Sequence, residues 1–411
     1  MKKIFAFLSF LFFLTLPLLL NDSFVSAAND QGYVPGRVLV KFKDGSTQND
    51  VDKQIRGNNA TVVDKIKALG VLVLKVPESA EDKVANALSK NPQVEYAEPD
   101  YYAQALWVPN DPYFGKQWGL HNTGQPVEGV VGLADADIDA VEAWDVTKGN
   151  VNVKVAILDT GIDNNHEDLA GQVILSKDFT GSASGTNDIY GHGTHVSGIV
   201  AAVTGNSVGV AGVCPNCKLI NVKVLNDSGY GTYSWVASGI TWAADNGAKV
   251  INMSLGGSSP SKTLEKAVNY AWGKGVVLVG AAGNSGNQSK TYPGAYTNVI
   301  AVAATDNRDK KAYFSEYGSR WVDIAAPGVN VFSTFPNHNY VIGKDLGYDY
   351  GSGTSMSTPM VSGVAGLVWS IPAYGTSATA VRSRIELTAD DIPGTGTYWS
   401  AGRVNAFNAV K

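Results

Sequence analysis

The stretch Lys154-Val155-Ala156-Ile157-Leu158-Asp159-Thr160-Gly161-Ile162 joins a short apolar run to a polar turn, and this unit recurs along the chain. Similar runs occupy residues 218–225, 248–255, 276–279 and 299–303, with helical segments between them. Near-continuous apolar runs of this length are typical of strands that are buried on both faces. The pattern therefore predicts an α/β fold, with a doubly wound, mostly parallel sheet and helices on both faces.

The N-terminal part of the 411-residue chain has a different pattern. Residues 37–42 alternate as a strand does, residues 71–76 form a second apolar run, and polar helical stretches lie near 48–57 and 80–88. We expect a small α+β domain over residues 28–105, with its boundary within 101–106. A large second domain is expected over residues 106–411.

The N-terminus has the features of a secretory signal peptide. Lys2 and Lys3 precede an apolar run at residues 4–20, and Val25-Ser26-Ala27 offers the small residues that a signal peptidase accepts. We therefore expect a signal peptide at residues 1–27 and a secreted, extracellular protein. An uncleaved membrane anchor is the alternative, because the run is about as long as the shortest spanning helix. No later run is long enough to span a bilayer, so we expect no membrane partner for the mature form.

The net charge bears on nucleic-acid binding, and the spacing of the cysteines bears on disulfide formation. With 32 Lys and Arg against 37 Asp and Glu, the net charge of −5 argues against a nucleic-acid-binding protein. The two cysteines form the motif Cys214-Pro215-Asn216-Cys217. In an exported protein such a close pair is expected to be a disulfide that clips a loop, with free thiols or a redox pair as alternatives.

Side chains that can carry chemistry follow the apolar runs. Ligands of a parallel sheet bind at the carboxyl ends of its strands. Asp159 stands at such an end, although alone it would be a turn or capping residue. In Gly191-His192-Gly193-Thr194-His195, His192 opens a helix of small residues and His195 lies one turn later. This pair could hold a metal, but no HExxH motif is present, so we expect His192 to accept a proton and His195 to be structural.

A serine and an asparagine complete the set. The motif GTSMSTP at residues 353–359 places Ser355 before an apolar helix at residues 360–370, where a serine alone would be a cap. A serine becomes a nucleophile when a base stands beside it and a carboxylate holds that base in one tautomer. Asn284 follows another strand and can donate to a developing oxyanion, or it can be a turn residue. With Asp159 and His192, these residues predict chemistry through a nucleophilic serine.

The motifs DTGI, HGTH and GTSMSTP, in this order and with SLGG and AAGN between the last two, resemble the subtilisin-type serine proteases. The segments NDPYF at residues 110–114 and GITWAADNGAKVI at 239–251 are similar to the thermitase branch of that family. Residues 28–105 resemble the inhibitor-like propeptide that such enzymes carry. The resemblance implies a subtilisin-like fold and a secreted serine endopeptidase that cleaves proteins with broad specificity.

The resemblance also implies a role for each catalytic group. Asp159 would orient His192, and His192 would take the proton of Ser355, which forms an acyl-enzyme. Asn284 and the main-chain N–H of Ser355 would form the oxyanion hole. A polypeptide substrate would lie as an added strand against two segments, with an apolar or aromatic residue before the cut. These segments are Gly229, Tyr230 and Gly231, and Ser254, Leu255 and Gly256.

Structural Ca²⁺ is a further implication of the resemblance. The ligands would be oxygen donors, which suit this hard cation. They are Asp111, Asp168, Asn206 and the carbonyls of Val203, Val208 and Val210. A second site would use Asp178, but residues 180–187 lack the acidic residues that the family has there.

The chain itself is expected to provide a partner for the catalytic domain. A large parallel sheet with many non-local pairings folds slowly, so a small domain that packs on it can serve as a folding template. The propeptide would be both intramolecular chaperone and inhibitor, with its tail near residues 101–106 as the first substrate. We expect self-cleavage and a monomeric mature enzyme.

Three other functions are weighed against this one. The sequence Gly205-Asn206-Ser207-Val208-Gly209 matches the GxSxG motif of esterases, but a helix precedes it and His338 is the one histidine that follows. A non-enzymatic binder would have lost a catalytic group, and all four are present. A processing protease of limited specificity stays as the alternative; acid-lined pockets and extra recognition domains would mark it, and neither is evident from the sequence.

Overall fold

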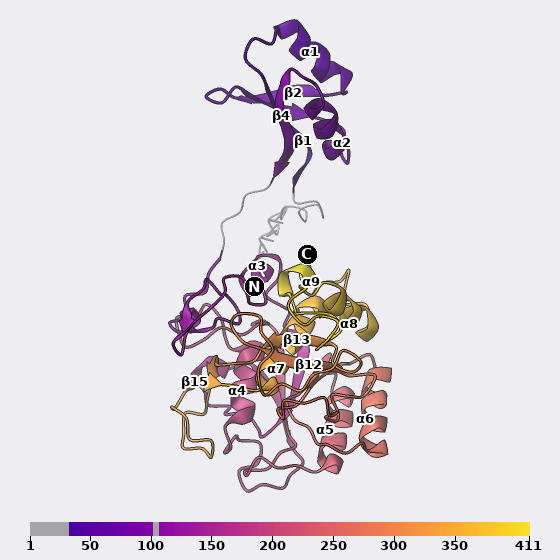
Figure 1. Cartoon of the computed structure of the whole chain (residues 1–411). Helices are drawn as coiled ribbons and strands as arrows, with labels where there is room; N and C mark the ends of the chain where they lie inside the picture. The colour runs from indigo at the N-terminus through magenta and orange to yellow at the C-terminus, as the bar shows by residue number, and fades with distance from the viewer. Residues whose placement is uncertain (1–32, 102–106) are drawn as a thin grey trace, which may run out of the picture. The chain divides into compact units, whose positions relative to one another are not determined.

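The computed structural model describes residues 33–101 and 107–411. The expected signal peptide at residues 1–27 and residues 102–106 of the expected processing region lie outside this part of the chain. The chain divides into two compact units, Met1–Ala105 and Leu106–Lys411. Figure 1 shows both units with their elements.

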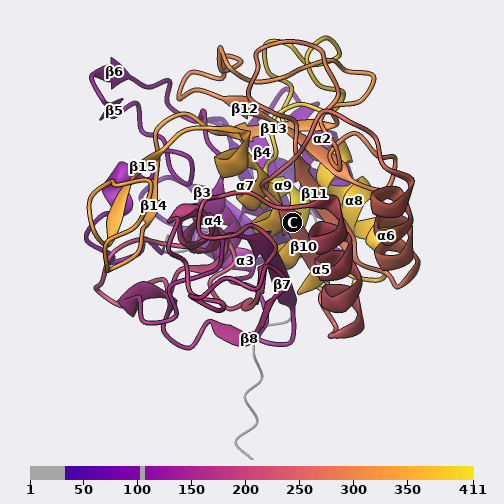
Figure 2. The ribbon, with the colours of Figure 1, turned by 90° about the horizontal axis from the view of Figure 1, so that it is seen from below.

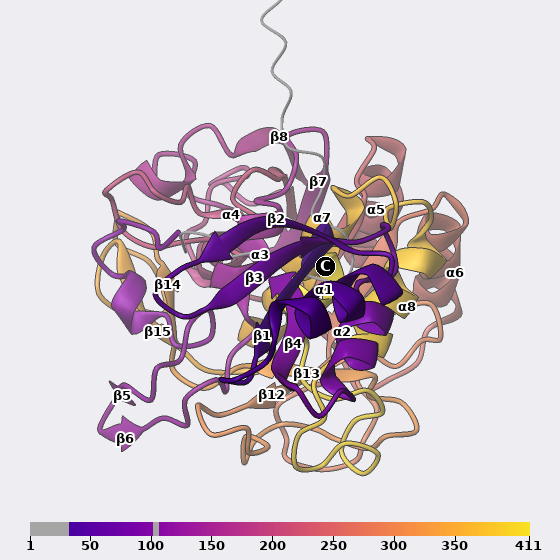
Figure 3. The same cartoon turned by 90° about the horizontal axis from the view of Figure 1, so that it is seen from above.

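The first unit is a four-stranded antiparallel sheet with two helices. Its elements are β1 (Tyr33–Phe42), α1 (Gln48–Gly57), β2 (Thr61–Ile66), β3 (Val71–Lys75), α2 (Glu81–Ser89) and β4 (Val94–Tyr101), with strand order β2-β3-β1-β4. Figure 3 shows α1 and α2 beside the strands of this sheet. The apolar side chains of both helices, Val51 and Leu88 among them, form one core with Val38, Val40 and Leu74. The expected small α+β unit is confirmed.

Two strands of this unit are not indicated by the sequence. β2 is exposed along its whole length, so it has no alternating pattern of apolar residues. β4 contains Pro99, which cannot donate a hydrogen bond to a neighbouring strand. Because β4 lies at the edge of the sheet, one side of the strand needs no partner and the proline is tolerated.

The second unit contains a seven-stranded parallel sheet, which confirms the predicted fold class. The strand order is β13-β12-β11-β10-β7-β9-β8, and every neighbouring pair is parallel. The strands are β7 (Lys154–Asp159), β8 (Val173–Asp178), β9 (Lys218–Lys223), β10 (Val250–Met253), β11 (Val277–Ala281), β12 (Ile300–Thr305) and β13 (Ile324–Pro327). The five apolar runs of the sequence become β7, β9, β10, β11 and β12.

Helices cover both faces of this sheet. Val155 and Ile157 of β7 face a core shared with α4 (His192–Ala201) and α7 (Thr354–Trp369). Ala156 and Leu158, which point the other way, face α5 (Tyr233–Asp245) and α6 (Lys262–Gly273). Figure 2 shows α5 and α6 side by side. The remaining elements are η1 (Phe114–Lys116), β5 (Pro126–Val127), β6 (Val130–Val131), α3 (Ala140–Val146), η2 (Glu167–Leu169), β14 (Val331–Thr334), β15 (Tyr348–Gly351), α8 (Ala378–Leu387) and α9 (Ala406–Val410).

Helix α7 begins earlier than the sequence suggests. The expected helix spans residues 360–370, with Pro359 in or before its first turn, whereas α7 starts at Thr354 and includes Pro359. The proline has no N–H for the carbonyl of Ser355, four residues earlier. The Ser254 hydroxyl donates to that carbonyl instead, at 2.8 Å, so the early start leaves no unpaired acceptor. Within the described ranges, α7 and the other helices are each too short or too polar to cross a bilayer.

Candidate active site

Three neighbouring strands bring residues to one edge of the sheet. β7 ends at Asp159, Ser254 follows β10, and Asn284 lies shortly after β11. These strands are adjacent in the order β11-β10-β7, and parallel strands place their carboxyl ends at a common edge. α4 and α7 begin with His192 and Thr354-Ser355, so both expected side chains stand in a first helical turn.

Asp159 and His192 are in direct contact. The His192 Nδ1 atom lies 2.8 Å from Asp159 Oδ1, and the carboxylate is 1% exposed. The main chains approach closely at this point: a Cβ added to Gly193 would lie 2.1 Å from the Gly161 carbonyl oxygen. The glycine of the HGTH motif therefore lets the start of α4 reach the turn after β7.

This contact controls the protonation of the imidazole. Burial disfavours the charged form of His192, but the charge and the hydrogen bond of Asp159, with the more distant charge of Asp188, outweigh it. The pKa of His192 is therefore raised above its usual 6.5. Because Nδ1 faces a carboxylate, it carries the proton of the neutral ring, and Nε2 is left as the acceptor.

Ser355 lies in the same cavity as His192 but does not bond to it. Both side chains line a 550 Å³ cavity together with Asn284. The Ser355 hydroxyl donates to the Ser254 carbonyl at 3.2 Å. Between these described side chains no His192–Ser355 hydrogen bond is formed. The structure therefore brings carboxylate and imidazole into contact, while the serine shares a cavity with the imidazole and bonds to the Ser254 carbonyl.

Asn284 is held with its amide in a defined orientation. Its Oδ1 atom accepts hydrogen bonds from the Thr354 N–H at 2.8 Å and from the Thr354 hydroxyl at 3.0 Å. The Thr354 N–H belongs to the first turn of α7, where main-chain donors have no partner within the helix. With Oδ1 occupied, Nδ2 is the donor left for the cavity that Asn284 and Ser355 line.

Comparison with known proteins identifies the family. Residues 150–404 match the model of the subtilase family, Peptidase S8, and residues 21–100 match that of the fervidolysin N-terminal prodomain. The chain is 44% identical over 391 residues to a thermophilic serine proteinase of Bacillus sp. (strain AK1), covering 94% of this chain and 90% of that protein. The chain is a subtilase. It is therefore a serine endopeptidase that carries an N-terminal prodomain.

Two further similarities concern the thermitase branch and the fold. The subtilase is 50% identical over 306 residues to thermitase of Thermoactinomyces vulgaris. The aligned region covers 74% of this chain and 100% of thermitase. A protease of Pseudoalteromonas arctica PAMC 21717 has a similar structure, with a TM-score of 0.65 at 34% identity. That likeness covers 74% of this chain and 99% of the other.

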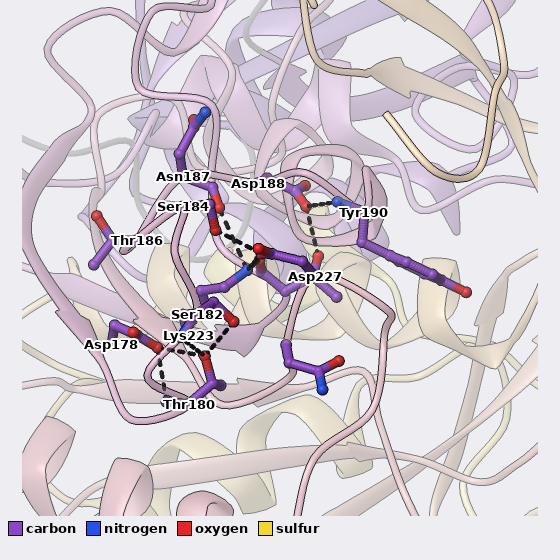
Figure 4. Close-up of polar contacts among 12 residues, drawn as sticks. Asp178, Thr180, Ser182, Ser184, Thr186, Asn187, Asp188, Tyr190, Lys223 and Asp227 are labelled. Atoms are coloured by element: carbon purple, nitrogen blue, oxygen red, sulfur yellow. Dashed lines mark hydrogen bonds and ion pairs between the residues drawn. The ribbon is translucent and has the colours of Figure 1, made fainter. Parts of the chain in front are cut away.

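Asp188 is a residue of the site that sequence reasoning missed. It is fully buried, and its carboxylate accepts five hydrogen bonds from the turn after β7 and the start of α4. The donors are the Thr160 hydroxyl, the N–H groups of Tyr190, Gly191 and Thr194, and the Thr194 hydroxyl, at 2.8 to 3.1 Å. Figure 4 shows Asp188 beside Tyr190. Asp188 therefore ties the residue after Asp159 to the residues around His192.

A buried cation stabilises the neighbouring loop. Lys223, the last residue of β9, is fully buried, and its ammonium lies 3.1 Å from Asp227 Oδ1. The ammonium also donates to the Thr160 carbonyl. A further hydrogen bond joins it to the Asn187 carbonyl (Figure 4). In the sequence, Lys223 is a lysine near the end of an apolar run. A sequence pattern alone does not distinguish a buried lysine at this position from an exposed lysine.

Asp178 is engaged in a local turn. Its Oδ1 atom accepts hydrogen bonds from the N–H and the hydroxyl of Thr180, each at 2.7 Å (Figure 4). The Thr180 hydroxyl in turn lies 2.7 Å from the Ser182 hydroxyl. Asp178, Thr180 and Ser182 are therefore linked by hydrogen bonds within this loop.

The predicted substrate-binding residues separate into two groups. Leu255 and Gly256 line a second cavity of 430 Å³, which Asn284 and Ser355 share. Ser254 is 3% exposed and bonds to Ser355 on both its main chain and its side chain. Gly229, Tyr230 and Gly231 line neither cavity; the Tyr230 side chain is 76% exposed, between β9 and α5.

The side chains of the predicted Ca²⁺ site do come together. Asp168 Oδ1 accepts from Asn206 Nδ2 at 2.9 Å, and Asp168 Oδ2 accepts from the Val210 N–H at 2.7 Å. Asp111 Oδ2 accepts from the Gly205 N–H at 2.7 Å, while its buried Oδ1 has no partner in the described chain. Burial, aided by the charge of Asp111, raises the pKa of Asp168 to about 7. A cation that binds oxygen ligands would neutralise these two buried carboxyls and give Asp111 Oδ1 a partner.

Transition-metal ligation has less support. His195 lies beside the carbonyls of Val331 and Asp349, at 3.2 and 3.3 Å from Nε2, and burial lowers its pKa to about 3. It is a neutral, buried side chain that anchors α4 to the β14–β15 hairpin, as expected for a structural histidine. Over residues 33–101 and 107–411, no group of three or more His, Cys, Asp or Glu side chains could hold a metal.

The two cysteines are bonded to each other. The Cys214–Cys217 disulfide closes the loop before β9 and is fully buried. It packs against α7, where a Cβ added to Gly366 would lie 2.8 Å from the Cys217 sulfur. The disulfide is therefore part of the buried interior that contacts α7, the helix that begins with Thr354 and Ser355.

Proposed function

We propose that this subtilase hydrolyses peptide bonds in proteins through Asp159, His192 and Ser355, with a broad choice of flanking sequence. The observation that carries the proposal is the 2.8 Å contact between His192 Nδ1 and Asp159 Oδ1 at a cavity that Ser355 and Asn284 also line. A base held by a carboxylate is what a serine needs to act as a nucleophile.

Substrate binding would start the reaction by freeing the serine. At rest the Ser355 hydroxyl donates to the Ser254 carbonyl. An extended substrate that adds a strand beside Ser254 would bring a main-chain N–H to that carbonyl. The hydroxyl would then rotate to His192 Nε2, which is the free acceptor of the ring.

Acyl transfer then proceeds in two halves. Ser355 Oγ attacks the peptide carbonyl carbon as His192 takes its proton, and Asn284 Nδ2 with the Ser355 N–H stabilises the oxyanion. His192 gives the proton to the leaving amine, which leaves an ester on Ser355. Water, deprotonated by the same imidazole, hydrolyses the ester and returns the serine.

The N-terminal part of the chain would regulate maturation. In this proposal residues 1–27 direct secretion, and residues 28–105 are a propeptide that assists folding of residues 106–411 and inhibits them. Self-cleavage near residues 101–106 then releases a monomeric extracellular enzyme. A Ser355→Ala precursor should keep its full length in a protease-free host; normal trimming of that variant would exclude self-cleavage.

Ca²⁺ would stabilise the folded enzyme without taking part in the chemistry. Asp111, Asp168 and Asn206 would hold it with the carbonyls of Val203, Val208 and Val210. Support comes from the buried, unpaired Asp111 Oδ1 atom and its proximity to Asp168. The ion would neutralise two buried carboxylates and fix the loop between α4 and β9.

The proposal is tested by activity and labelling together. Purified enzyme is incubated with denatured casein, with and without a serine-directed fluorophosphonate, and the labelled peptide is identified by mass spectrometry. We expect casein cleavage that the reagent abolishes, with the label on Ser355. A label on any other serine would refute the assignment of the nucleophile.

A further inference from the structure

The second cavity contains an ionisable group that the mechanism does not use. This 430 Å³ cavity begins at Ser355 and Asn284, and Glu316 is part of its wall. Glu316 comes from the loop after β12, far in sequence from the three motifs of the site. According to the family resemblance, the walls formed by Leu255 and Gly256 belong to the pocket for the residue before the cut.

Glu316 is fixed close to the oxyanion residue. Its N–H donates to the Gly283 carbonyl at 3.0 Å, and Gly283 directly precedes Asn284. Its carboxylate lies so near the Gly283 α-carbon that a Cβ there would be 1.4 Å from Glu316 Oε2. Gly283 has φ of +114°, a second reason why the position requires glycine. The Glu316 carboxylate therefore packs against the main chain of Gly283, the residue before Asn284.

No basic side chain of the described chain pairs with this carboxylate. Glu316 is 4% exposed, and Oε2 accepts from the Thr291 hydroxyl at 2.8 Å. Buried carboxylates are normally paired with a cation. The other ionisable residue of the cavity wall, Lys290, is exposed and outside ion-pair distance of Glu316.

The carboxyl group lacks charge compensation in the free enzyme. Burial raises the pKa of Glu316, and the hydrogen bonds of Thr291 and Ser285, both in the cavity wall, oppose this rise without cancelling it. A cation that entered the cavity would favour the ionised carboxylate and gain a charge-assisted hydrogen bond.

We infer that Glu316 makes this cavity selective for a basic side chain, lysine or arginine, on the residue before the cut. The inference rests on the proposed peptidase function and specifies its substrate class. It differs from the apolar or aromatic preference that the resemblance implies. It concerns only the residue before the cut, so a broad choice at the other positions of the substrate remains.

The first test uses the unmodified enzyme and two peptide substrates that differ at one side chain. One has lysine before the cut and the other has norleucine, which has a similar apolar chain without the ammonium. We expect kcat/KM to be about 10- to 100-fold higher for lysine, as a hydrogen bond to a charged group provides. Equal cleavage, or a preference for norleucine, would overturn the inference.

The second test replaces the carboxylate by an amide of the same shape. Glu316→Gln should lower the ratio of kcat/KM for the lysine peptide to that for the norleucine peptide by about 10- to 100-fold, which abolishes the preference for lysine. Glu265→Gln makes the same change in net charge at an exposed position of α6 and should leave the preference intact. A preference that survives Glu316→Gln would show that the carboxylate does not select the substrate.

These outcomes separate the inference from the function on which it rests. If the enzyme cleaves neither peptide and fluorophosphonate does not label Ser355, both fail. If it cleaves the norleucine peptide and is labelled, but does not prefer lysine, only the role of Glu316 fails. The comparison of lysine with norleucine needs no variant, so it decides even if Glu316→Gln does not fold.

Discussion

Replacement of Asp188 by asparagine tests how the structure holds His192 in place. The Asp188 carboxylate makes no hydrogen bond to the His192 ring, yet it bonds to main-chain groups on both sides of that residue. Asparagine keeps the size of the side chain and removes the charge and one acceptor oxygen. The effect on the enzyme is therefore an effect of charge and hydrogen bonding rather than of lost volume.

The magnitude follows from the donors that surround the two oxygens. An amide NH2 in place of Oδ1 would face the N–H groups of Tyr190 and Gly191, whereas in place of Oδ2 it would face that of Thr194. The threonine hydroxyls can turn to accept, so the second orientation leaves one buried N–H unpaired. Since relief of a buried charge offsets the weakening of the other bonds, we expect a net loss of about 2 kcal/mol.

Stability is measured on chains that cannot digest themselves. In a Ser355→Ala background, Asp188→Asn should lower the free energy of unfolding in urea by about 2 kcal/mol, or Tm by about 2 to 3 °C for a protein of this size. Asp391→Asn makes the same change in charge at an exposed position and serves as control. An unchanged Tm for Asp188→Asn would refute the hydrogen-bond account.

The pH profile separates a positioning role from general destabilisation. The charge of Asp188 contributes to the raised pKa of His192. A neutral amide should therefore lower that pKa, and the acid limb of kcat should move to lower pH because His192 must be neutral to accept a proton. For Asp188→Asn we expect this shift together with a kcat that is lower by about tenfold at similar KM. The control Asp391→Asn should show neither change. An acid limb that stays in place in Asp188→Asn would exclude the positioning role.

Three further predictions follow from the site. Asp159→Asn should lower kcat by about 10⁴-fold and move the acid limb of the residual activity to lower pH, since the charge that raises the His192 pKa is gone; a limb at unchanged pH would contradict the assigned pair. Asn284→Ala should lower kcat by about 10²- to 10³-fold with KM nearly unchanged, and a loss confined to KM would contradict its oxyanion role. Removal of Ca²⁺ by a chelator should lower the free energy of unfolding by about 3 kcal/mol, for an ion present at 100 times its Kd, and should lower Tm accordingly. Asp168→Asn should make Tm insensitive to the chelator. Equal sensitivity in both proteins would refute the site.

The sequence sufficed for features that depend on local pattern. Apolar runs become the central strands β7, β9, β10, β11 and β12 because both faces of those strands are buried. The positions of Asp159 and Asn284 follow from the same rule, since residues after parallel strands share one edge. Exposed or edge strands such as β2 and β4 have no such pattern, and they were missed for that reason.

Residues whose role depends on long-range contacts could not be found in this way. Asp188 and Glu316 stand in polar loops that look like ordinary surface, and burial is what makes them significant. Lys223 ends a strand that the pattern predicts, but nothing in the pattern says that its ammonium is buried against Thr160 and Asn187. In each case the charge is recognisable in the sequence, whereas its partners come from elements distant in the chain.

The resting position of Ser355 links binding to reactivity. The carbonyl that holds its hydroxyl belongs to Ser254, the residue after β10, where an added substrate strand would begin. In the proposed mechanism, a small molecule that enters the cavity without pairing to this carbonyl would leave the hydroxyl bonded to it. In the same mechanism, an extended peptide would compete for the same acceptor, and in doing so it would release the nucleophile toward its base. Main-chain pairing at Ser254 would therefore raise kcat as well as affinity, because part of the binding energy is used to form the reactive arrangement.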